Sequence, residues 1–261
     1  MNQHPAPSTQ HPLDIARVRA SLPGRQISFF ESITSTMHEA ATLAAAGAPS
    51  GTAVVAEEQT AGQGRHGHSW HSEPGTGLYV SVVLRLPLPP DSLPVLTLAL
   101  GLATAETIAR ATDLQPDLRW PNDVMLGDKK TAGILVQLVD SVAIAGLGIN
   151  VNHPALPPEI ANEATSLRRA TGRPQSREDL LIGLLPTIDS FCRMLLQAGR
   201  QPIIDQFERR SSYARGKRVR VDQPGGTVTG TTAGLDPSGF LKLRADDGSE
   251  SLILAGGVRP L

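Results

Sequence analysis

The spacing of hydrophobic and polar positions changes repeatedly along the first half of the chain. The predicted elements are a helix over 13–24, a strand over 25–31, a helix over 35–47, strands over 51–59 and 77–86, and a buried helix over 92–112. The first helix should stop at Pro23 and Gly24, and Thr36 and Glu39 have the spacing of a capping box. Residues 1–12 are polar and proline-rich, which predicts a disordered tail.

The second half continues the mixture of helices and strands. Three β-rich runs follow at 117–126, 129–141 and 142–151, and the tight turns between them favour antiparallel pairing. Two helices are predicted over 176–199 and 201–211, with a kink or early break at Pro186. This mixture predicts an α+β fold with a mixed, largely antiparallel sheet rather than a regular βαβ repeat.

The pattern changes again near residue 213. Short alternating strands are now separated by Pro-Gly-Gly, Asp-Pro-Ser-Gly and Asp-Asp-Gly turns. We therefore expect a tail and short helix over 1–24, a main domain over 25–212, and an SH3-like β-module over 213–261. A core this small gives little stability by itself, so we expect the module to pack against the main domain.

Composition excludes several classes of function. The 24 basic and 25 acidic side chains give a net charge of −1, which favours neither nucleic acid nor an anionic membrane. Glu106 and Arg110 interrupt the apolar helix, so we expect no membrane span. The N-terminus lacks the features of a signal peptide, and the single cysteine, Cys192, favours a reducing compartment. A cytoplasmic protein is predicted.

The loop over residues 57–77 is rich in glycine and histidine and has three interpretations. Gly62 and Gly64 would let the backbone approach an anion, with Arg65 as a fixed cation. The second interpretation is a metal site built on His66, His68 and His71, and the third is a solvated loop. The loop is neither a Walker A loop nor a dinucleotide fingerprint, because the Gly-Lys-Ser/Thr ending and the following helix are missing.

Four shorter motifs could also bind a ligand or take part in catalysis, and each also has a purely structural explanation. They are Ser35-Thr36 at a helix start, Trp120-Pro121-Asn122-Asp123, Lys130 to Gly133, and Gly146 to Asn152. The structural explanation is helix capping for the first motif and an Asx turn for the second. It is a solvent-exposed hairpin for the third and ordinary turn residues for the fourth. The functional alternative is a ligand against a glycine-bearing strand, with hydroxyl, amide, carboxylate and ammonium groups around it.

In their order and spacing, these motifs resemble the biotin protein ligases from about Phe29 to the C-terminus. The motifs are Ser35-Thr36, EEQTAGQGRHGHSW, LRWPNDVML, KKTAGIL and GLGINVN. The resemblance implies a class II synthetase-like catalytic domain and a small C-terminal β-module. It also implies activation of biotin by ATP and Mg²⁺ to biotinyl-5′-AMP, then transfer to a lysine of biotin carboxyl carrier protein.

The resemblance also implies roles for individual residues. The expected catalytic residues are Lys130, Arg65 and Asp123, with Mg²⁺ entering with ATP near Asp123 and no fixed metal site. The expected biotin contacts are Ser35, Thr36, Met37, Gln59, Gln63, Gly64, Arg65, Lys130 and Gly133. The expected adenylate contacts are Gly62, Gly64, Arg65, Trp70, Asn122, Lys130 and Asn150, with residues 57–77 as a mobile loop.

The chain departs from the family pattern at four positions. Met37 stands where many members have asparagine, and Gln63, His66 and His68 replace common arginines. With fewer fixed cations, we expect faster release of the adenylate. Too few residues precede the resemblance for the helix-turn-helix of some members, so no DNA binding is expected, and a homodimer is possible. A lipoate–protein ligase, a non-catalytic biotin or nucleotide sensor, and a metal-binding protein are the rival interpretations.

Overall fold

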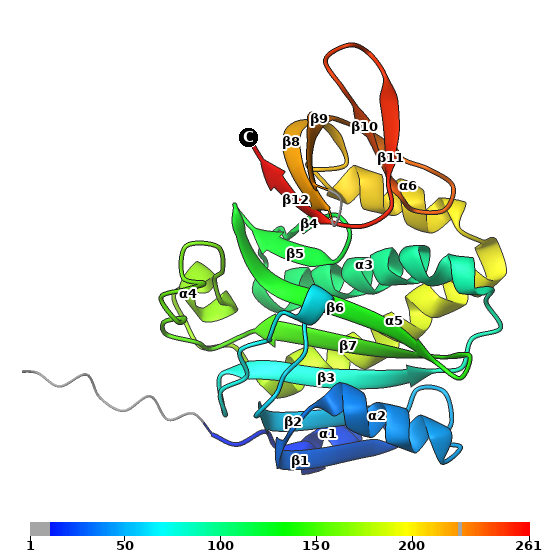
Figure 1. Ribbon diagram of the computed structural model, residues 1–261. Coiled ribbons are helices and arrows are strands. Elements are labelled where there is room, and N and C mark those ends of the chain that lie inside the picture. Colours follow the sequence, from blue (N-terminus) through cyan, green and yellow to red (C-terminus); the bar gives the residue numbers. More distant parts are fainter. Residues whose placement is uncertain (1–10, 224–225) are drawn as a thin grey trace, which may run out of the picture.

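The computed structural model describes residues 11–223 and 226–261, so most of the predicted tail lies outside the described residues. Its main part is a seven-stranded sheet with the strand order β1-β2-β3-β7-β6-β5-β4 (Figure 1). The strands are β1 Ile27–Ile33, β2 Ala53–Gln59, β3 Gly77–Leu84, β4 Asp117–Arg119, β5 Asp123–Leu126, β6 Lys129–Val139 and β7 Val142–Asn150. Only the β1–β2 pair is parallel, and the other pairs are antiparallel. The predicted mixed, largely antiparallel sheet is confirmed.

The helices cover the two faces of this sheet unequally. The helices are α1 Ile15–Ser21, α2 Thr36–Ala45, α3 Leu93–Thr112, α4 Leu167–Thr171, α5 Arg177–Ala198 and α6 Gln201–Arg210. Helices α3 and α5 pack against one face together with Val55, Val80 and Val82 in the main core. On the other face α2 covers only part of the sheet, where Val54 and Ile144 join a smaller cluster. The uncovered part of that face is where a ligand site can form.

Helix α3 is the buried helix that the sequence predicts. The segment Pro90–Thr112 is long and apolar enough to cross a membrane by length and composition, but 72% of its apolar window is buried inside the protein. Its burial between the sheet and α5 explains the hydropathy.

Helix α5 continues through Pro186, so the early break expected there is wrong, and the alternative of a kink stays a prediction. Capping of α2 by Thr36 is also wrong. The helix N-cap of α2 is Ser35 rather than Thr36, and Ser35 makes no capping hydrogen bond through its side chain. The Thr36 hydroxyl instead contacts Gln59 and Ser81, because it faces the sheet. The sequence also gave no signal for α4 or for the short 3₁₀ turn Arg65–Gly67.

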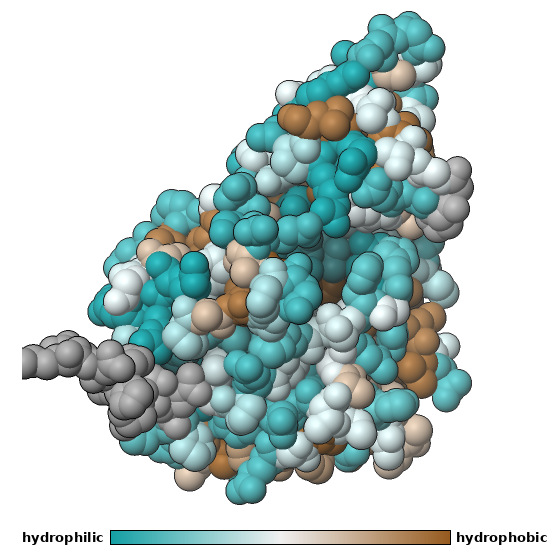
Figure 2. Space-filling view, turned by 60° about the vertical axis from the view of Figure 1, so that its left-hand side comes forward, coloured by the Kyte–Doolittle hydropathy of each residue, from teal (hydrophilic) through white to brown (hydrophobic). Residues whose placement is uncertain are grey.

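The C-terminal strands form a separate five-stranded antiparallel sheet. Its strands are β8 Arg215–Gln223, β9 Gly226–Leu235, β10 Leu241–Arg244, β11 Glu250–Ile253 and β12 Gly257–Pro260, in the order β11-β10-β9-β8-β12. Figure 2 shows this module standing out from the larger body. The Trp120 indole donates to the carbonyl of Gly239 at 2.9 Å, and Arg259 pairs with Glu163 at 2.8 Å. The module therefore packs on the main domain, as its small core predicts.

Candidate active site

Glycines make a flat floor on the face of the sheet that α2 leaves uncovered. Gly133 of β6 lies directly opposite Gly148 of β7, and Leu135 lies opposite Gly146. Alternate residues of a strand point to the same face, so these positions share one surface. Without side chains at Gly133, Gly146 and Gly148, another group can approach the strands closely.

Trp70 fills the space above this floor. A side-chain carbon added at Gly133 would lie 2.8 Å from Cζ3 of the indole, and one at Gly148 would overlap the ring. The remaining cavity has a volume of about 40 Å³. Ligand pockets usually measure several hundred Å³. The Trp70 Nε1–H donor is buried without a hydrogen-bond partner, which makes this position of the indole less favourable. A ligand that reaches the floor must displace the ring.

Trp70 is carried by the segment between β2 and β3, residues 60–76, which we call the tryptophan loop. Residues Gln63 and Ser69 pair as an isolated bridge, and the Gly64 N–H donates to the carbonyl of His68 at 2.7 Å. His66 has φ 55°, a left-handed conformation at the tip of this hairpin. Because the Gly64 N–H already has a partner, the loop presents Arg65 rather than this amide as its anion-binding group.

Three charged side chains meet at the edge of the cavity. The Lys130 Nζ lies 2.6 Å from Asp123 Oδ1, and the Arg119 Nη2 lies 2.8 Å from Asp123 Oδ2. Burial raises the pKa of Asp123, but the charges and hydrogen bonds of Lys130 and Arg119 outweigh burial and hold the pKa below its ordinary value. The Lys130 ammonium also lies 5.3 Å from the centroid of the Trp70 ring, within cation–π range.

Arg65 reaches across the cavity toward the C-terminal module. Its Nη1 donates to Asn122 Oδ1 at 3.1 Å and lies 3.5 Å from the carbonyl oxygen of Gly256. Burial lowers the pKa of Arg65, and the charge of Asp123 partly opposes this effect. The Asn122 Nδ2 donates to the carbonyl of Ile134 at 2.9 Å. Asn122 thus links Arg65 to the β6 strand.

Polar groups line the opposite end of the cavity, at the start of α2. The Gln59 Oε1 accepts from the Thr36 N–H at 2.9 Å, and the Gln59 Nε2 donates to Ser72 Oγ at 3.0 Å. The Ser35 hydroxyl is buried without a partner. Met37 is buried in the apolar cluster under α2, and its sulfur approaches Gly146.

Most of the expected site residues come together in this cavity. Those that line it are Thr36, Met37, Gln59, Gln63, Gly64, Arg65, Trp70, Asn122, Lys130 and Gly133. Ser35, Gly62, Asp123 and Asn150 do not line it. Gly62 accepts from the Trp70 N–H, and Asn150 donates to the carbonyl of Thr165 at 3.1 Å. Their ligand contacts stay predictions. Three further residues belong to the site: Gly146 and Gly148 line the cavity, and Arg119 pairs with Asp123. In the sequence, the two glycines within one strand already pointed to a close approach of a ligand.

Neither expected metal position has a ready set of ligands. Mg²⁺ prefers several oxygen ligands, whereas the Asp123 carboxylate is held between two cations. The residues around Asp123 therefore do not fit a protein-held Mg²⁺. His66 and His68 are exposed, and among the described residues the one group with metal-ligand spacing is His71, Glu73 and His153.

Comparison with known proteins identifies close relatives. The biotin/lipoate A/B protein ligase family matches residues 29–153, and the biotin protein ligase C-terminal domain matches residues 215–258. A bifunctional ligase/repressor BirA of Bacillus spizizenii is 36% identical over 248 residues, which cover 91% of this chain and 75% of that protein. The biotin–[acetyl-CoA-carboxylase] ligase of Mycobacterium tuberculosis is 32% identical over 257 residues, which cover 94% of each chain.

A solved structure agrees with these sequence matches. The biotin protein ligase from Aquifex aeolicus in complex with biotin and ATP has a TM-score of 0.80 and 31% identity, and covers 90% of this chain and 99% of its own. Both the main domain and the C-terminal module are therefore shared with that structure.

Proposed function

The chain belongs to the biotin protein ligase family, and from that premise we propose how its side chains divide the work of the reaction. As a biotin–[acetyl-CoA-carboxylase] ligase, it joins biotin to a carboxyl carrier protein and uses ATP. In the first step a biotin carboxylate oxygen attacks the α-phosphorus of ATP, and pyrophosphate leaves. In the second step the amine of a carrier lysine attacks the acyl carbon, AMP leaves, and an amide forms.

Binding begins with the displacement of Trp70. The floor of Gly133 and Gly148 suits a flat apolar ligand, and the present cavity of about 40 Å³ is too small for one. The tryptophan loop must swing outward and then close over the bound ligand. The indole, freed from the floor, can then cover the ligand and donate its unpaired Nε1–H.

The first step has to bring two anions together. A carboxylate and a phosphate repel strongly in a site that excludes water, so fixed cations must compensate for both. Lys130 can exchange its contact with Asp123 for substrate oxygens, because its ammonium forms an ion pair with only one oxygen of this carboxylate, at 2.6 Å. Asp123 remains paired with Arg119 and positions Lys130. Arg65 supplies the second cation once it leaves Asn122. Mg²⁺ would enter with the ATP phosphates, and no step here depends on a protein ligand for it.

The polar end of the cavity suits the ureido head of biotin. An amide such as Gln59 both donates and accepts, and the unpaired Ser35 hydroxyl offers a further partner nearby. Met37 makes this end less polar than the asparagine of other members. Biotin would therefore bind with its ureido head at the start of α2 and its carboxylate at Lys130.

The observation that carries this proposal is the position of Lys130 at the wall of a glycine-floored cavity, with its Nζ 2.6 Å from the carboxylate of Asp123. The test supplies the purified chain with MgATP, a biotin carboxyl carrier domain and either biotin or lipoate, and measures the mass of the carrier. We expect a mass increase with biotin only, and none when the acceptor lysine is replaced by arginine. A mass increase with lipoate alone would assign the chain to lipoate transfer instead. A cytoplasmic location, a possible homodimer and the absence of DNA binding stay predictions.

A further inference from the structure

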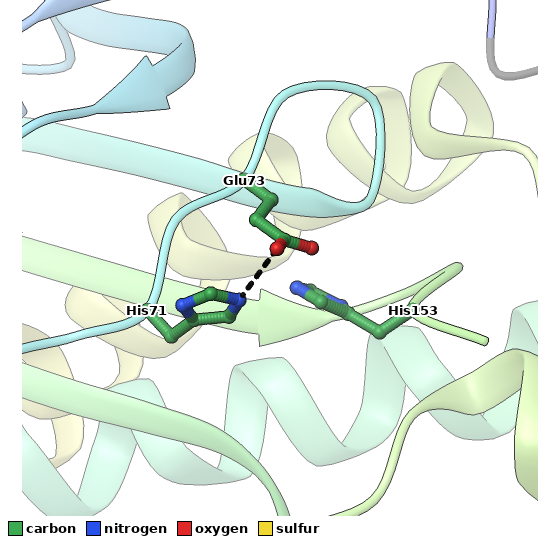
Figure 3. Close-up of side chains that lie close together, drawn as sticks. All are labelled: His71, Glu73 and His153. Atoms are coloured by element: carbon green, nitrogen blue, oxygen red, sulfur yellow. Dashed lines mark ion pairs between the residues drawn. The ribbon is translucent and has the colours of Figure 1, made fainter. Parts of the chain in front are cut away.

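Two imidazoles and a carboxylate converge at the end of the tryptophan loop, outside the residues that line the cavity. Figure 3 shows His71, Glu73 and His153 pointing toward one another. One ligand atom from each lies within 4.8 Å of the others, and the His71 Nε2 is 3.4 Å from Glu73 Oε1. The two imidazole rings have centroids 5.8 Å apart. Nothing in the biotin or ATP contacts proposed above uses this group.

The hydrogen bonds around His153 leave one ring nitrogen available. His153 is fully buried, and its Nε2 lies 2.8 Å from the Thr76 hydroxyl oxygen. That hydroxyl donates to the carbonyl of Glu73 at 2.9 Å, so it accepts from His153 Nε2–H. The Nδ1 then carries a lone pair, and it is buried with no hydrogen-bond partner. The Nε2 of His71 is likewise buried without a hydrogen-bond partner.

Such a histidine has the arrangement of a metal ligand. Histidines that bind metals donate their second ring N–H to a neighbouring oxygen, which fixes the ring and the tautomer. In a tetrahedral zinc site, bonds of about 2.0–2.1 Å place neighbouring ligand atoms roughly 3.4 Å apart. The distance between His71 and Glu73 already has this value. The exposed Glu73 side chain can move to close the remaining distances.

We propose that His71, Glu73 and His153 bind a divalent transition-metal ion of the zinc type, with water completing the coordination. Two imidazoles and one carboxylate suit Zn²⁺, whereas Mg²⁺ prefers oxygen ligands throughout. His71 directly follows Trp70, and His153 lies just beyond β7, whose Gly148 the indole covers. The ion fastens the C-terminal end of the tryptophan loop to the end of β7, and it reduces the freedom of the segment that carries Trp70.

The test uses the full chain without a histidine tag and without biotin or ATP. Zn²⁺ binding is measured by competition with a chromophoric chelator, and Co²⁺ binding by visible absorption. We expect one ion per chain, with a cobalt spectrum typical of nitrogen and oxygen ligands. Zn²⁺ should also raise the melting temperature. Less than one bound ion per chain, or a melting temperature that Zn²⁺ does not change, would overturn the proposal.

Matched variants separate this site from the rest of the loop. His71→Ala should weaken Zn²⁺ binding by about 100-fold or more, since loss of even a supporting contact costs 10- to 100-fold. Glu73→Gln should weaken it less. The double variant His66→Ala/His68→Ala removes two exposed histidines of the same loop and should bind like the parent. His153→Gln gives a second test if it folds, and His71→Ala decides alone if it does not. Equal affinity of His71→Ala and the parent would refute the site.

Discussion

The ion pairs of two carboxylates, Glu57 and Asp123, differ in geometry and serve different purposes. Glu57 accepts both Nη groups of Arg177, at 2.8 and 3.1 Å, and the N–H of Gly75 at 3.0 Å. It also accepts the N–H of Leu13. The side chains of Glu57 and Arg177 are only 8% and 5% exposed. The carboxylate of Glu57 thus accepts four hydrogen bonds, and the pair joins the start of α5 to β2 and to the C-terminal end of the tryptophan loop.

The group of Asp123, Lys130 and Arg119 is more open. The Lys130 side chain is 27% exposed, its ammonium lies close to only one oxygen of Asp123, and it borders a cavity. A bidentate guanidinium has one favourable geometry, whereas an ammonium is a point charge on a flexible stem that can exchange partners. The first ion pair therefore maintains the fold, whereas the second holds a cation ready for a substrate.

The largest effect should follow from breaking the closed pair. Glu57→Gln keeps the shape of the side chain but leaves Arg177 as a buried charge without its counter-ion. We expect the free energy of unfolding to fall by about 3–5 kcal/mol. For a chain of this size that corresponds to a decrease in melting temperature of roughly 6–20 °C. Calorimetry at pH 7 measures this change.

The pH dependence of the same variant gives an internal control. Burial raises the pKa of Glu57, but the hydrogen bonds and charge of Arg177 outweigh it and bring the pKa below the ordinary value of 4.5. A carboxyl with a lowered pKa contributes its stability above the unfolded value and loses it as the pH falls through the folded value. The difference between Glu57→Gln and the parent should therefore shrink below pH 4.5. Asp246→Asn, in an exposed pair with Arg218, should leave the melting temperature unchanged.

The next largest effect should follow from removing the exchangeable cation. Lys130→Ala should lower the rate of adenylate formation by about 10²–10³-fold, the usual loss for one preorganised charge-stabilising group. Its melting temperature should change little. Lys129→Ala removes the neighbouring lysine, whose Nζ donates to the carbonyl of Ala161 at 3.2 Å, away from Asp123. Isotope exchange between pyrophosphate and ATP measures the first step, and equal rates in both variants would remove Lys130 from its assigned role.

A smaller effect is expected at the floor of the cavity. In Gly148→Ala, the added methyl group would overlap the position of the Trp70 ring. Overpacking costs about 1–3 kcal/mol. The same methyl group would also stand on the floor where biotin has to lie, and this clash with the ligand should raise the KM for biotin roughly tenfold or more with kcat nearly unchanged. The fluorescence of Trp70 should shift toward that of a water-exposed indole before ligand is added. Gly183→Ala in α5, where the nearest atom is Thr107 Cγ2 at 3.6 Å, should behave like the parent.

The sequence predicted the parts of this molecule that depend on neighbouring residues. Alternation and turn residues were enough to predict most strands of the main sheet and the β-structure of the C-terminal module, although the single run expected over 117–126 forms the two strands β4 and β5. The glycines of GLG were visible as a possible ligand contact. Helix α5 passed through Pro186 because packing against α3 outweighs the loss of one hydrogen bond. The order of motifs carried the family assignment, which the comparisons confirm.

Long-range contacts were not accessible in this way. Glu57 and Arg177 are separated by 120 residues, and no local pattern marks either as a partner of the other. His71 was grouped by spacing with His66 and His68, whereas the fold places it beside His153. Arg119 and Trp70 gained their positions from the register of β4, β5 and β6 and from the loop that folds over them. Such contacts depend on the completed sheet rather than on local spacing.

The smallest expected effect concerns the charge of the tryptophan loop. Gln63 and His68 are exposed on the hairpin, and Gln63 lines the cavity. Arginines at these positions would face the adenylate phosphate, and exposed ion pairs are worth about 0.2–1 kcal/mol each. The double variant Gln63→Arg/His68→Arg should therefore release biotinyl-5′-AMP roughly two- to thirtyfold more slowly in stopped-flow measurements. Added salt should reduce this difference, since it screens exposed charges. As a control, Gln197→Arg adds a charge at an exposed position on α5 and should not change the release rate. If both variants release the adenylate more slowly, net charge rather than the tryptophan loop controls its retention.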